Sequence, residues 1–194
     1  MTTPALRFPP IADADLTPEQ RAVAAEIAAG PRGGVRGPFV ALLHQPALAR
    51  HVQALGEHLR FGTTLSSDLI ELAVLATAQR WQCRHEWIPH ARLARLAGIG
   101  DDAIDAIAAD QPPPGLTEDQ ALVLRFAQET QRGGAPADET FERAAARFGR
   151  AGVLDLLALC GYYTMLAMVL NTAQGPLPPD AAPPLRTLNP PESR

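Results

Sequence analysis

The sequence predicts an all-α fold, and its local signals are those of helix ends. Thr17 to Gln20 and Thr117 to Gln120 each have the pattern of a capping box, in which the side chains of the first and last residue close a helix N-terminus. Glycine or proline punctuates the ends of most apolar segments. No segment alternates polar and apolar residues between hairpin turns, so we expect no sheet.

The expected helices follow one another with short connections. A glycine-rich loop over residues 30–38 carries Arg32 and Arg36, and is either a plain connector or a mobile loop over a pocket. The helices are expected from Pro18 to Gly30, from Pro46 to Phe61, from a cap at Ser66 or Ser67 to about Arg80, from near Cys83 to Gly98, from Asp101 to Ala109, from Thr117 to about Arg132, from a cap at Asp138 to Gly149, and from about Arg150 to Ala173.

The chain length suits one domain, which we place over residues 1–175. Seven of the 19 prolines follow Gly175, so residues 176–194 form a proline-rich tail that cannot be helical and is either disordered or extended. The formal net charge is −4 and no basic stripe is present, which argues against nucleic acid as a partner. The N-terminus lacks the pattern of a secretion signal, and the cytoplasm is the expected compartment.

One apolar segment, residues 151–170, is long enough to cross a bilayer. It is interrupted by Asp155 and Gly161, and it is the only such segment in the chain. A helix that is apolar on every side is also typical of a buried core helix, which is the interpretation we favour. We therefore expect no membrane partner.

The residues with the most chemical potential lie between Glu71 and His90. At about 100° per residue, Cys83, Glu86 and His90 fall on one face of a helix, whereas His85 points away from it. Glu71 lies on the preceding helix, and a short antiparallel hairpin would bring it against this face.

Three kinds of chemistry are possible here. His85 and His90 resemble the zinc motif HExxH but are five residues apart, so they do not share a face and we expect no metal. Cys83 near a helix start could be a reactive thiol, but the Glu86 carboxylate beside it disfavours the thiolate. The third possibility is acid–base chemistry, in which His90 transfers a proton between Glu71 and Glu86. The simpler alternative is that Glu86 and His90 form an ordinary i,i+4 pair on an exposed helix face.

At these residues the sequence resembles the carboxymuconolactone decarboxylase family, which includes the alkyl hydroperoxidase D proteins. In the redox branch a glutamate precedes a Cys-x-His-Cys-x-x-x-His motif, and Glu71, Cys83, His85 and His90 match that spacing. Glu86 stands where the second cysteine of the motif would be. The resemblance therefore points to a subgroup that lacks the pair of thiols.

The resemblance extends along most of the chain in a non-redox subgroup. It implies a helical bundle with the site on an antiparallel hairpin, assembled as trimers or hexamers with sites at subunit contacts. Pro89 departs from the pattern, because it removes a backbone hydrogen bond and is expected to kink the helix near His85. The other matching positions are Leu16 to Gln20, Gly37 to Phe39, Glu86 with Trp87, Gly161 to Tyr163, and Asn171.

Three functions are consistent with these residues. The first is a cofactor-free lyase or isomerase acting on a small carboxylated lactone or enol, with His90 as proton donor, Glu71 orienting it and Glu86 as a second proton carrier. The second is a thiol redox protein that uses Cys83. The third is a helical oligomer that binds a small ligand without converting it. Candidate contacts to the substrate are Arg32, Arg36, Arg84 and Tyr163.

Overall fold

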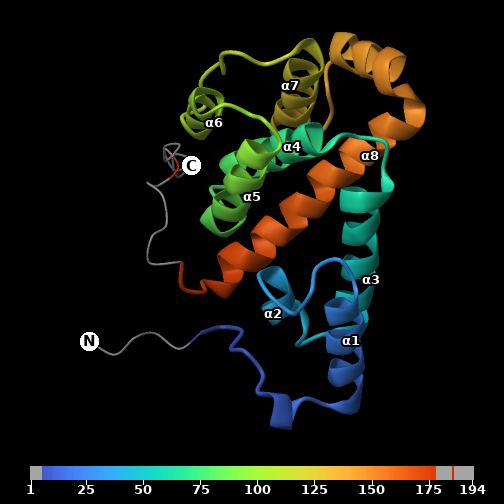
Figure 1. Ribbon diagram of the computed structural model, residues 1–194, viewed down its shortest axis with the longest axis vertical. Coiled ribbons are helices and arrows are strands. Elements are labelled where there is room, and N and C mark those ends of the chain that lie inside the picture. Colours follow the sequence, from blue (N-terminus) through green and yellow to red (C-terminus); the bar gives the residue numbers. More distant parts are fainter. Residues whose placement is uncertain (1–5, 178–184, 186–194) are drawn as a thin grey trace, which may run out of the picture. The chain divides into compact units, whose positions relative to one another are not determined.

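The computed structural model describes residues 6–177 and Leu185, and within these residues all regular elements are helices (Figure 1). The all-α prediction is therefore confirmed. The described part of the chain divides into two compact units, one containing residues 6–62 and 168–176, the other containing residues 63–167, Leu177 and Leu185. The single domain over residues 1–175 stays a prediction. Of the predicted tail, residues 178–184 and 186–194 lie outside the described residues.

The first unit contains α1 (Pro18–Ala29), α2 (Pro38–Leu42) and α3 (Pro46–Glu57), which continues into one π-helical turn at His58–Gly62. The predicted capping box at the start of α1 is confirmed, because Thr17 accepts a hydrogen bond from the Gln20 backbone and Gln20 accepts one from the Thr17 backbone. Helix α2 was not predicted. Helices α1 and α3 pack together, and the buried apolar residues of this unit include Val23, Ile27, Phe39, Ala49, Val52 and Leu59.

The second unit is built around α4 (Ser67–Arg80). Helix α4 packs against α5 (Arg84–Leu96), α6 (Asp101–Ala108) and α7 (Glu118–Gly133). Every residue of α4 from Leu69 to Gln79 is buried, so this helix has no solvent-facing side over that stretch. Its burial explains why residues 69–78 are almost all apolar. The one carboxylate in the stretch, Glu71, consequently needs a partner inside the unit.

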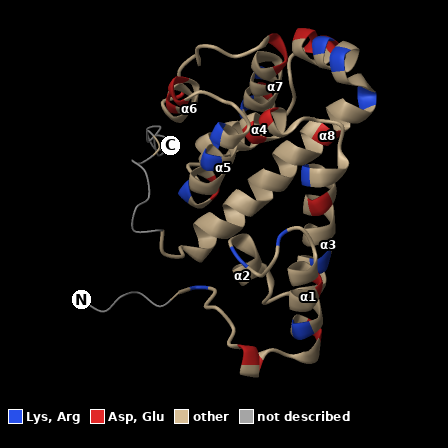
Figure 2. Ribbon diagram, viewed as in Figure 1, with Lys and Arg blue, Asp and Glu red and all other residues tan. Residues whose placement is uncertain are grey.

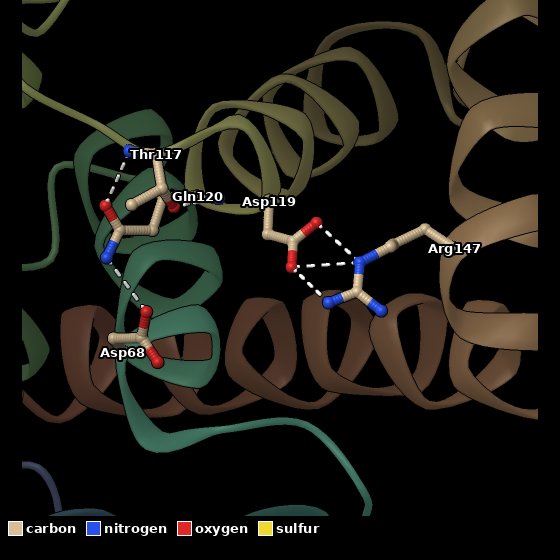
Figure 3. Close-up of polar contacts among 5 residues, drawn as sticks. All are labelled: Asp68, Thr117, Asp119, Gln120 and Arg147. Atoms are coloured by element: carbon tan, nitrogen blue, oxygen red, sulfur yellow. Dashed lines mark hydrogen bonds and ion pairs between the residues drawn. The ribbon is translucent and has the colours of Figure 1, made fainter.

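Polar contacts fix the start of α7 (Figure 3). Thr117 and Gln120 form the predicted capping box, and the Gln120 amide also donates a 2.9 Å hydrogen bond to Asp68 at the start of α4. Asp119 accepts hydrogen bonds of 2.6–3.0 Å from the guanidinium of Arg147 on the following helix. These contacts hold the ends of three helices of the second unit in register.

The last helix, α8 (Asp138–Ala173), is longer than predicted because two expected helices join. Gly149 still leaves the helical conformation, with φ 70° and ψ 170°, so the predicted break at this glycine is confirmed. The prediction that Asp138 caps the helix is wrong, since Asp138 is its first residue and Phe141 donates to the Ala137 carbonyl.

Charge is distributed unevenly along α8 (Figure 2). Arginine and acidic residues gather before Gly149, and the charged residues of α8 after it are Arg150 and Asp155. The apolar part is long and hydrophobic enough to cross a membrane by length and composition, with half of its most apolar window buried in the structure. A core helix has the same properties, so this is weak evidence for a membrane span.

Candidate active site

A three-residue turn between α4 and α5 brings the two helices back against each other. The backbone N–H of Trp81 bonds to the Thr77 carbonyl and that of Cys83 bonds to the Ala78 carbonyl, at 3.0 and 2.9 Å. Between them Gln82 has a φ of 50°, the left-handed conformation that closes such a helix end. The predicted helical hairpin is therefore confirmed, and Cys83 is the residue that precedes the first turn of α5.

This hairpin places His90 between two glutamates. Nδ1 of His90 lies 2.6 Å from Oε2 of Glu71 on α4, and Nε2 lies 3.3 Å from Oε2 of Glu86, one turn earlier on α5. All three residues are about 5% exposed. The simpler alternative of an exposed Glu86–His90 surface pair is therefore wrong, because the pair is buried and its histidine has a second carboxylate partner.

The two carboxylates determine the charge of the His90 ring. Burial disfavours the imidazolium and lowers the pKa, but hydrogen bonds to Glu71 and Glu86 and the charges of both carboxylates outweigh it. The pKa of His90 consequently lies above its ordinary value. The short contact to Glu71 makes Nδ1 the protonated nitrogen in either charge state, so Nε2 is the nitrogen that gains or loses a proton.

Glu86 has one oxygen that faces His90 and one that lacks a hydrogen-bond partner among the described residues. Oε2 faces His90, whereas Oε1 is buried and has no hydrogen-bond partner among the described residues. A buried carboxylate oxygen without a donor costs about 1–3 kcal/mol or more. Such an atom is expected where a ligand or a water molecule supplies the missing donor.

An aromatic side chain, that of Tyr163, packs against the histidine. The Tyr163 ring on α8 meets the His90 ring edge to face, with centroids 5.0 Å apart and an interplanar angle of 86°. Trp87 on α5 is buried. The structure thus brings the predicted residue Tyr163 to the site, and the apolar surroundings strengthen the electrostatic interactions within the cluster.

Cys83 lies beside this cluster but has the properties of an unreactive thiol. It is fully buried, and burial together with the charge of Glu86 raises the pKa of the Cys83 thiol to about 11. Cys160 on α8 is buried as well, and burial raises its pKa to about 12. Both thiols therefore stay protonated at neutral pH, as expected for small buried apolar side chains.

The predicted arginines fall in two places. Arg32 and Arg36 belong to the first unit, where Arg32 donates a 2.8 Å hydrogen bond to Gln53 and stacks over the Phe39 ring at 4.4 Å. Arg36 donates to the backbone carbonyl of Arg32, so the loop is held by its own contacts. Arg84 is the first residue of α5 and is partly exposed. A role of these arginines in substrate binding stays a prediction.

His85 and Pro89 flank the functional face of α5. Pro89 lies inside the helix, which continues through it to Leu96. Both nitrogens of His90 contact carboxylates, Nδ1 that of Glu71 and Nε2 that of Glu86. Within the described residues, no group of three or more histidine, cysteine or acidic side chains could hold a metal ion.

The sequence did not predict a second polar cluster behind the hairpin, centred on Gln131 of α7. Its side-chain oxygen accepts a 2.9 Å hydrogen bond from the Trp81 indole, and its nitrogen lies 3.1 Å from Thr77 Oγ1 and 2.9 Å from Thr164 Oγ1. These contacts tie the end of α4 to α7 and α8. A single glutamine in an amphipathic helix gives no sequence signal for such a role.

A cavity of about 370 Å³ in the second unit lies apart from these residues. None of its lining residues is a predicted site residue, and they come from α7 and the connection before it, including Asp110, Pro113, Leu116, Leu124, Arg125 and Arg132. Arg132 is paired with Asp110 at 2.7 Å. The chemistry of the hairpin, rather than the volume of this cavity, therefore identifies the candidate site.

Residues 46–129, which include the whole hairpin, match the model of the carboxymuconolactone decarboxylase family. This part of the chain is therefore similar to that family. The resemblance found in the sequence at Glu71, Cys83, His85 and His90 is thus confirmed. No curated protein matches the chain.

The solved structures extend the likeness beyond the family segment. A crystal structure described as an alkylhydroperoxidase AhpD core, of an uncharacterized peroxidase-related protein from Ralstonia eutropha JMP134, matches with a TM-score of 0.72. The two chains are 21% identical, and the match covers 89% of this chain and 92% of that one. At this identity the likeness shows the fold alone. The carboxymuconolactone decarboxylase-like chain therefore has the AhpD-like helical fold that the sequence predicted.

Proposed function

We propose that this protein is a cofactor-free enzyme that moves a proton during decarboxylation or isomerisation of a small carboxylated lactone or enol. The observation that carries the proposal is the buried His90 ring held between Glu71 and Glu86. Members of the family are enzymes of the lyase or peroxidase type. The choice between these two chemistries depends on the side chains of this hairpin.

His90 has the properties of a general acid. Two carboxylates raise its pKa, so the protonated ring persists to a higher pH than in a solvated histidine. Glu71 holds Nδ1 at 2.6 Å, which orients the ring and stabilises its positive charge. The proton on Nε2 is then available to Glu86 or to a substrate that approaches this side.

In a decarboxylation, the bond between the substrate and its carboxylate breaks and CO₂ leaves. The bonding electron pair passes into the conjugated enolate of the lactone. A proton from the His90–Glu86 pair then forms the new C–H bond, and the pair regains a proton from water. An isomerisation uses the same groups, with the first proton taken from carbon instead of CO₂ being lost.

The thiol alternative receives less support. The matched crystal structure is of a peroxidase-related protein, and peroxidase chemistry in the resembling motif uses a second cysteine. In this chain Glu86 occupies that position, and the thiol of Cys83 is buried with its pKa raised to about 11. A protonated, inaccessible thiol reacts slowly with peroxide.

The proposal is tested by turnover of small unsaturated γ-lactones, with and without a ring carboxylate, followed by CO₂ release and ultraviolet absorbance. We expect His90→Gln to lower turnover by about 10²–10⁴-fold, the usual contribution of general acid–base catalysis. The double variant Glu71→Gln with His90→Gln removes the buried charge together with its partner and serves as the folding control. Unchanged turnover in folded His90→Gln protein would refute the assignment.

We further propose, as the family resemblance implies, that the chain acts as a homo-oligomer of trimer or hexamer type in the cytoplasm. Leu154 on the exposed side of α8 is 65% exposed, and Leu96 at the end of α5 is 73% exposed. Both leucines are candidates for residues that a subunit contact would cover. Sedimentation velocity of wild-type protein and of Leu154→Glu gives the oligomeric state, and a wild-type monomer at micromolar concentration contradicts the proposal.

A further inference from the structure

The two carboxylate oxygens of Glu86 differ in their hydrogen-bond partners, and this difference bears on which substrate could bind. Oε2 lies 3.3 Å from His90, while Oε1 is buried without a hydrogen-bond partner among the described residues. Glu86 as a whole is 5% exposed, so bulk solvent does not satisfy this oxygen. A donor is therefore missing at a defined atom, and a bound substrate is the natural source of that donor.

The charge of the cluster limits what this donor can be. Glu71 and Glu86 bring two negative charges, and His90 supplies at most one positive charge. The cluster is negative whether the histidine is protonated or not. A substrate carboxylate placed against Oε1 would meet a like charge in a water-poor environment, which costs several kcal/mol. A neutral donor has no such penalty.

His90 has both ring nitrogens engaged, whereas Glu86 has one oxygen without a hydrogen-bond partner among the described residues. Its Nδ1 is committed to Glu71 at 2.6 Å, and its Nε2 faces the inner oxygen of Glu86. Both ring nitrogens thus have partners within the protein, whereas Glu86 has an unused acceptor. The chain of contacts thus runs from Glu71 through His90 to Glu86, and the unused oxygen lies at its Glu86 end.

We propose that Oε1 of Glu86 contacts the substrate directly and removes a proton from a neutral C–H or O–H group. This inference rests on the proposed function and narrows it. The reacting part of the substrate is uncharged, and the reaction is an isomerisation by proton shift rather than the loss of a carboxylate. A carboxylate elsewhere on the substrate remains compatible with this site.

The proton balance closes within the cluster. Glu86 takes a proton from the carbon next to the substrate carbonyl, and the C–H electron pair becomes part of a conjugated enolate. Glu86 is then a neutral carboxylic acid whose inner oxygen still faces His90. The proton on Glu86, which can exchange with water at this stage, is then delivered to the far carbon of the conjugated system, which moves the double bond and restores the carboxylate. No oxidant, reductant or second substrate is required.

Ligand charge provides a test that does not require turnover. The two probes are 4-nitrophenol, a neutral O–H donor at mildly acidic pH, and 4-nitrobenzoate, an anion of similar size. We expect wild-type protein to bind the phenol at least about tenfold more tightly than the benzoate, because only the phenol supplies a donor without a negative charge. We also expect the bound phenol to ionise less readily than the free phenol. Isothermal titration and the phenolate absorbance band measure the two effects.

Substitution of Glu86 locates the effect at one residue. Glu86→Gln removes the negative charge and adds an amide donor, so we expect the preference for phenol over benzoate to fall by about tenfold or more. Glu142→Gln changes an exposed glutamate of the same unit and should leave both affinities unchanged. The wild-type comparison stands without the Glu86 variant, so a folding defect in that variant does not remove the test.

Several outcomes overturn the inference. Tighter binding of benzoate than of phenol contradicts the charge argument. Binding of neither probe means that Oε1 is not open to a substrate donor.

A third experiment separates this inference from the proposed function. It uses α-angelica lactone, a neutral β,γ-unsaturated lactone whose deuterium uptake from D₂O is visible by proton NMR.

The experiment with the lactone distinguishes failure of the proposed function from failure of this inference. We expect wild-type protein to exchange the ring CH₂ protons and to form the conjugated isomer, with Glu86→Gln slower by about 10²-fold or more. If decarboxylation of a carboxylated lactone depends on His90 but not on Glu86, the proposed function stands and this inference fails. If the phenol preference holds while no lactone is converted, the inference about the ligand stands and the proposed catalytic function fails.

Discussion

Oε2 of Glu71 lies 2.6 Å from Nδ1 of His90, across the hairpin formed by α4 and α5. The contact is buried, and it joins a helix whose residues face the core on all sides to the helix that carries the reactive face. It therefore contributes both to the stability of the hairpin and to the charge of the histidine. Each contribution can be measured separately.

Removal of the Glu71 carboxylate should destabilise the protein strongly. We expect Glu71→Ala to lower the free energy of unfolding by about 3–5 kcal/mol, the usual cost of breaking a buried ion pair by removing one partner. Glu71→Gln retains a hydrogen-bond acceptor and should cost less. Urea denaturation gives both values, and a loss below about 1 kcal/mol in Glu71→Ala would show that the pair contributes little.

The same contact predicts how stability depends on pH. The pKa of His90 is higher in the folded than in the unfolded chain, so the folded state binds the extra proton. The stabilisation from His90 is fully present below the unfolded pKa, about 6.5. It is lost as the pH rises through the raised folded pKa. The free energy of unfolding should decrease over this window in wild-type protein, and less so in the Glu71→Gln, His90→Gln double variant.

The state of the His90 ring can also be followed directly. Proton NMR of the histidine ring should give a titration midpoint above the ordinary value for His90 in wild-type protein, and a lower midpoint in Glu71→Gln. A His90 midpoint at or below the ordinary value for histidine, about 6.5, would contradict the raised pKa.

The thiols should be slow to react in the folded protein. Burial raises the pKa of Cys83 to about 11 and that of Cys160 to about 12, so both lack thiolate at neutral pH. We expect neither cysteine to be alkylated by iodoacetamide within minutes at pH 7.5, and both to be alkylated in denaturant. Mass spectrometry of peptides separates the two sites. Fast alkylation or peroxide oxidation of native Cys83 would favour the thiol function instead.

Gln131 should be important for stability although it lies outside the reactive cluster. Gln131→Leu leaves the Trp81 indole N–H and two threonine hydroxyls without this partner, at a cost of about 1–3 kcal/mol. Gln128→Leu is the matched control, because it makes the same chemical change one turn earlier on α7. Equal melting temperatures of the two variants would argue against a structural role of the Gln131 cluster.

The turn at Gln82 offers a test of the hairpin geometry. Its φ of 50° costs a non-glycine residue about 1–2 kcal/mol relative to the right-handed conformation, and β-branched residues tolerate it least. Gln82→Gly should leave stability nearly unchanged, because relief of this strain offsets the lost 2.6 Å hydrogen bond from the side chain to the Gln79 carbonyl. Gln82→Val should destabilise by about 1–2 kcal/mol or more. Similar unfolding midpoints for the two variants would contradict the observed turn.

Local signals in the sequence were sufficient for most of the helices. The capping boxes at Thr17 and Thr117 and the break at Gly149 involve groups within a few residues of one another, so their chemistry can be read from the residue order. The cap at Asp138 failed, because a neighbouring contact intervenes: the Glu129 carboxylate accepts a hydrogen bond from the Ala137 backbone at this helix start. The short α2 and the joined length of α8 were missed as well.

Helical periodicity and family spacing together identified Glu71, Glu86 and His90 as candidates and placed two of them on one face. They could not determine whether that face is buried, because burial depends on how α5 packs against α4 and α8. The edge-to-face contact of Tyr163 with His90 and the unpartnered oxygen of Glu86 follow only from that packing. Residue order thus specifies which groups are available, whereas the tertiary contacts set their charge and their access to a ligand. The reason is that desolvation and hydrogen bonding act through space, between residues far apart in the chain.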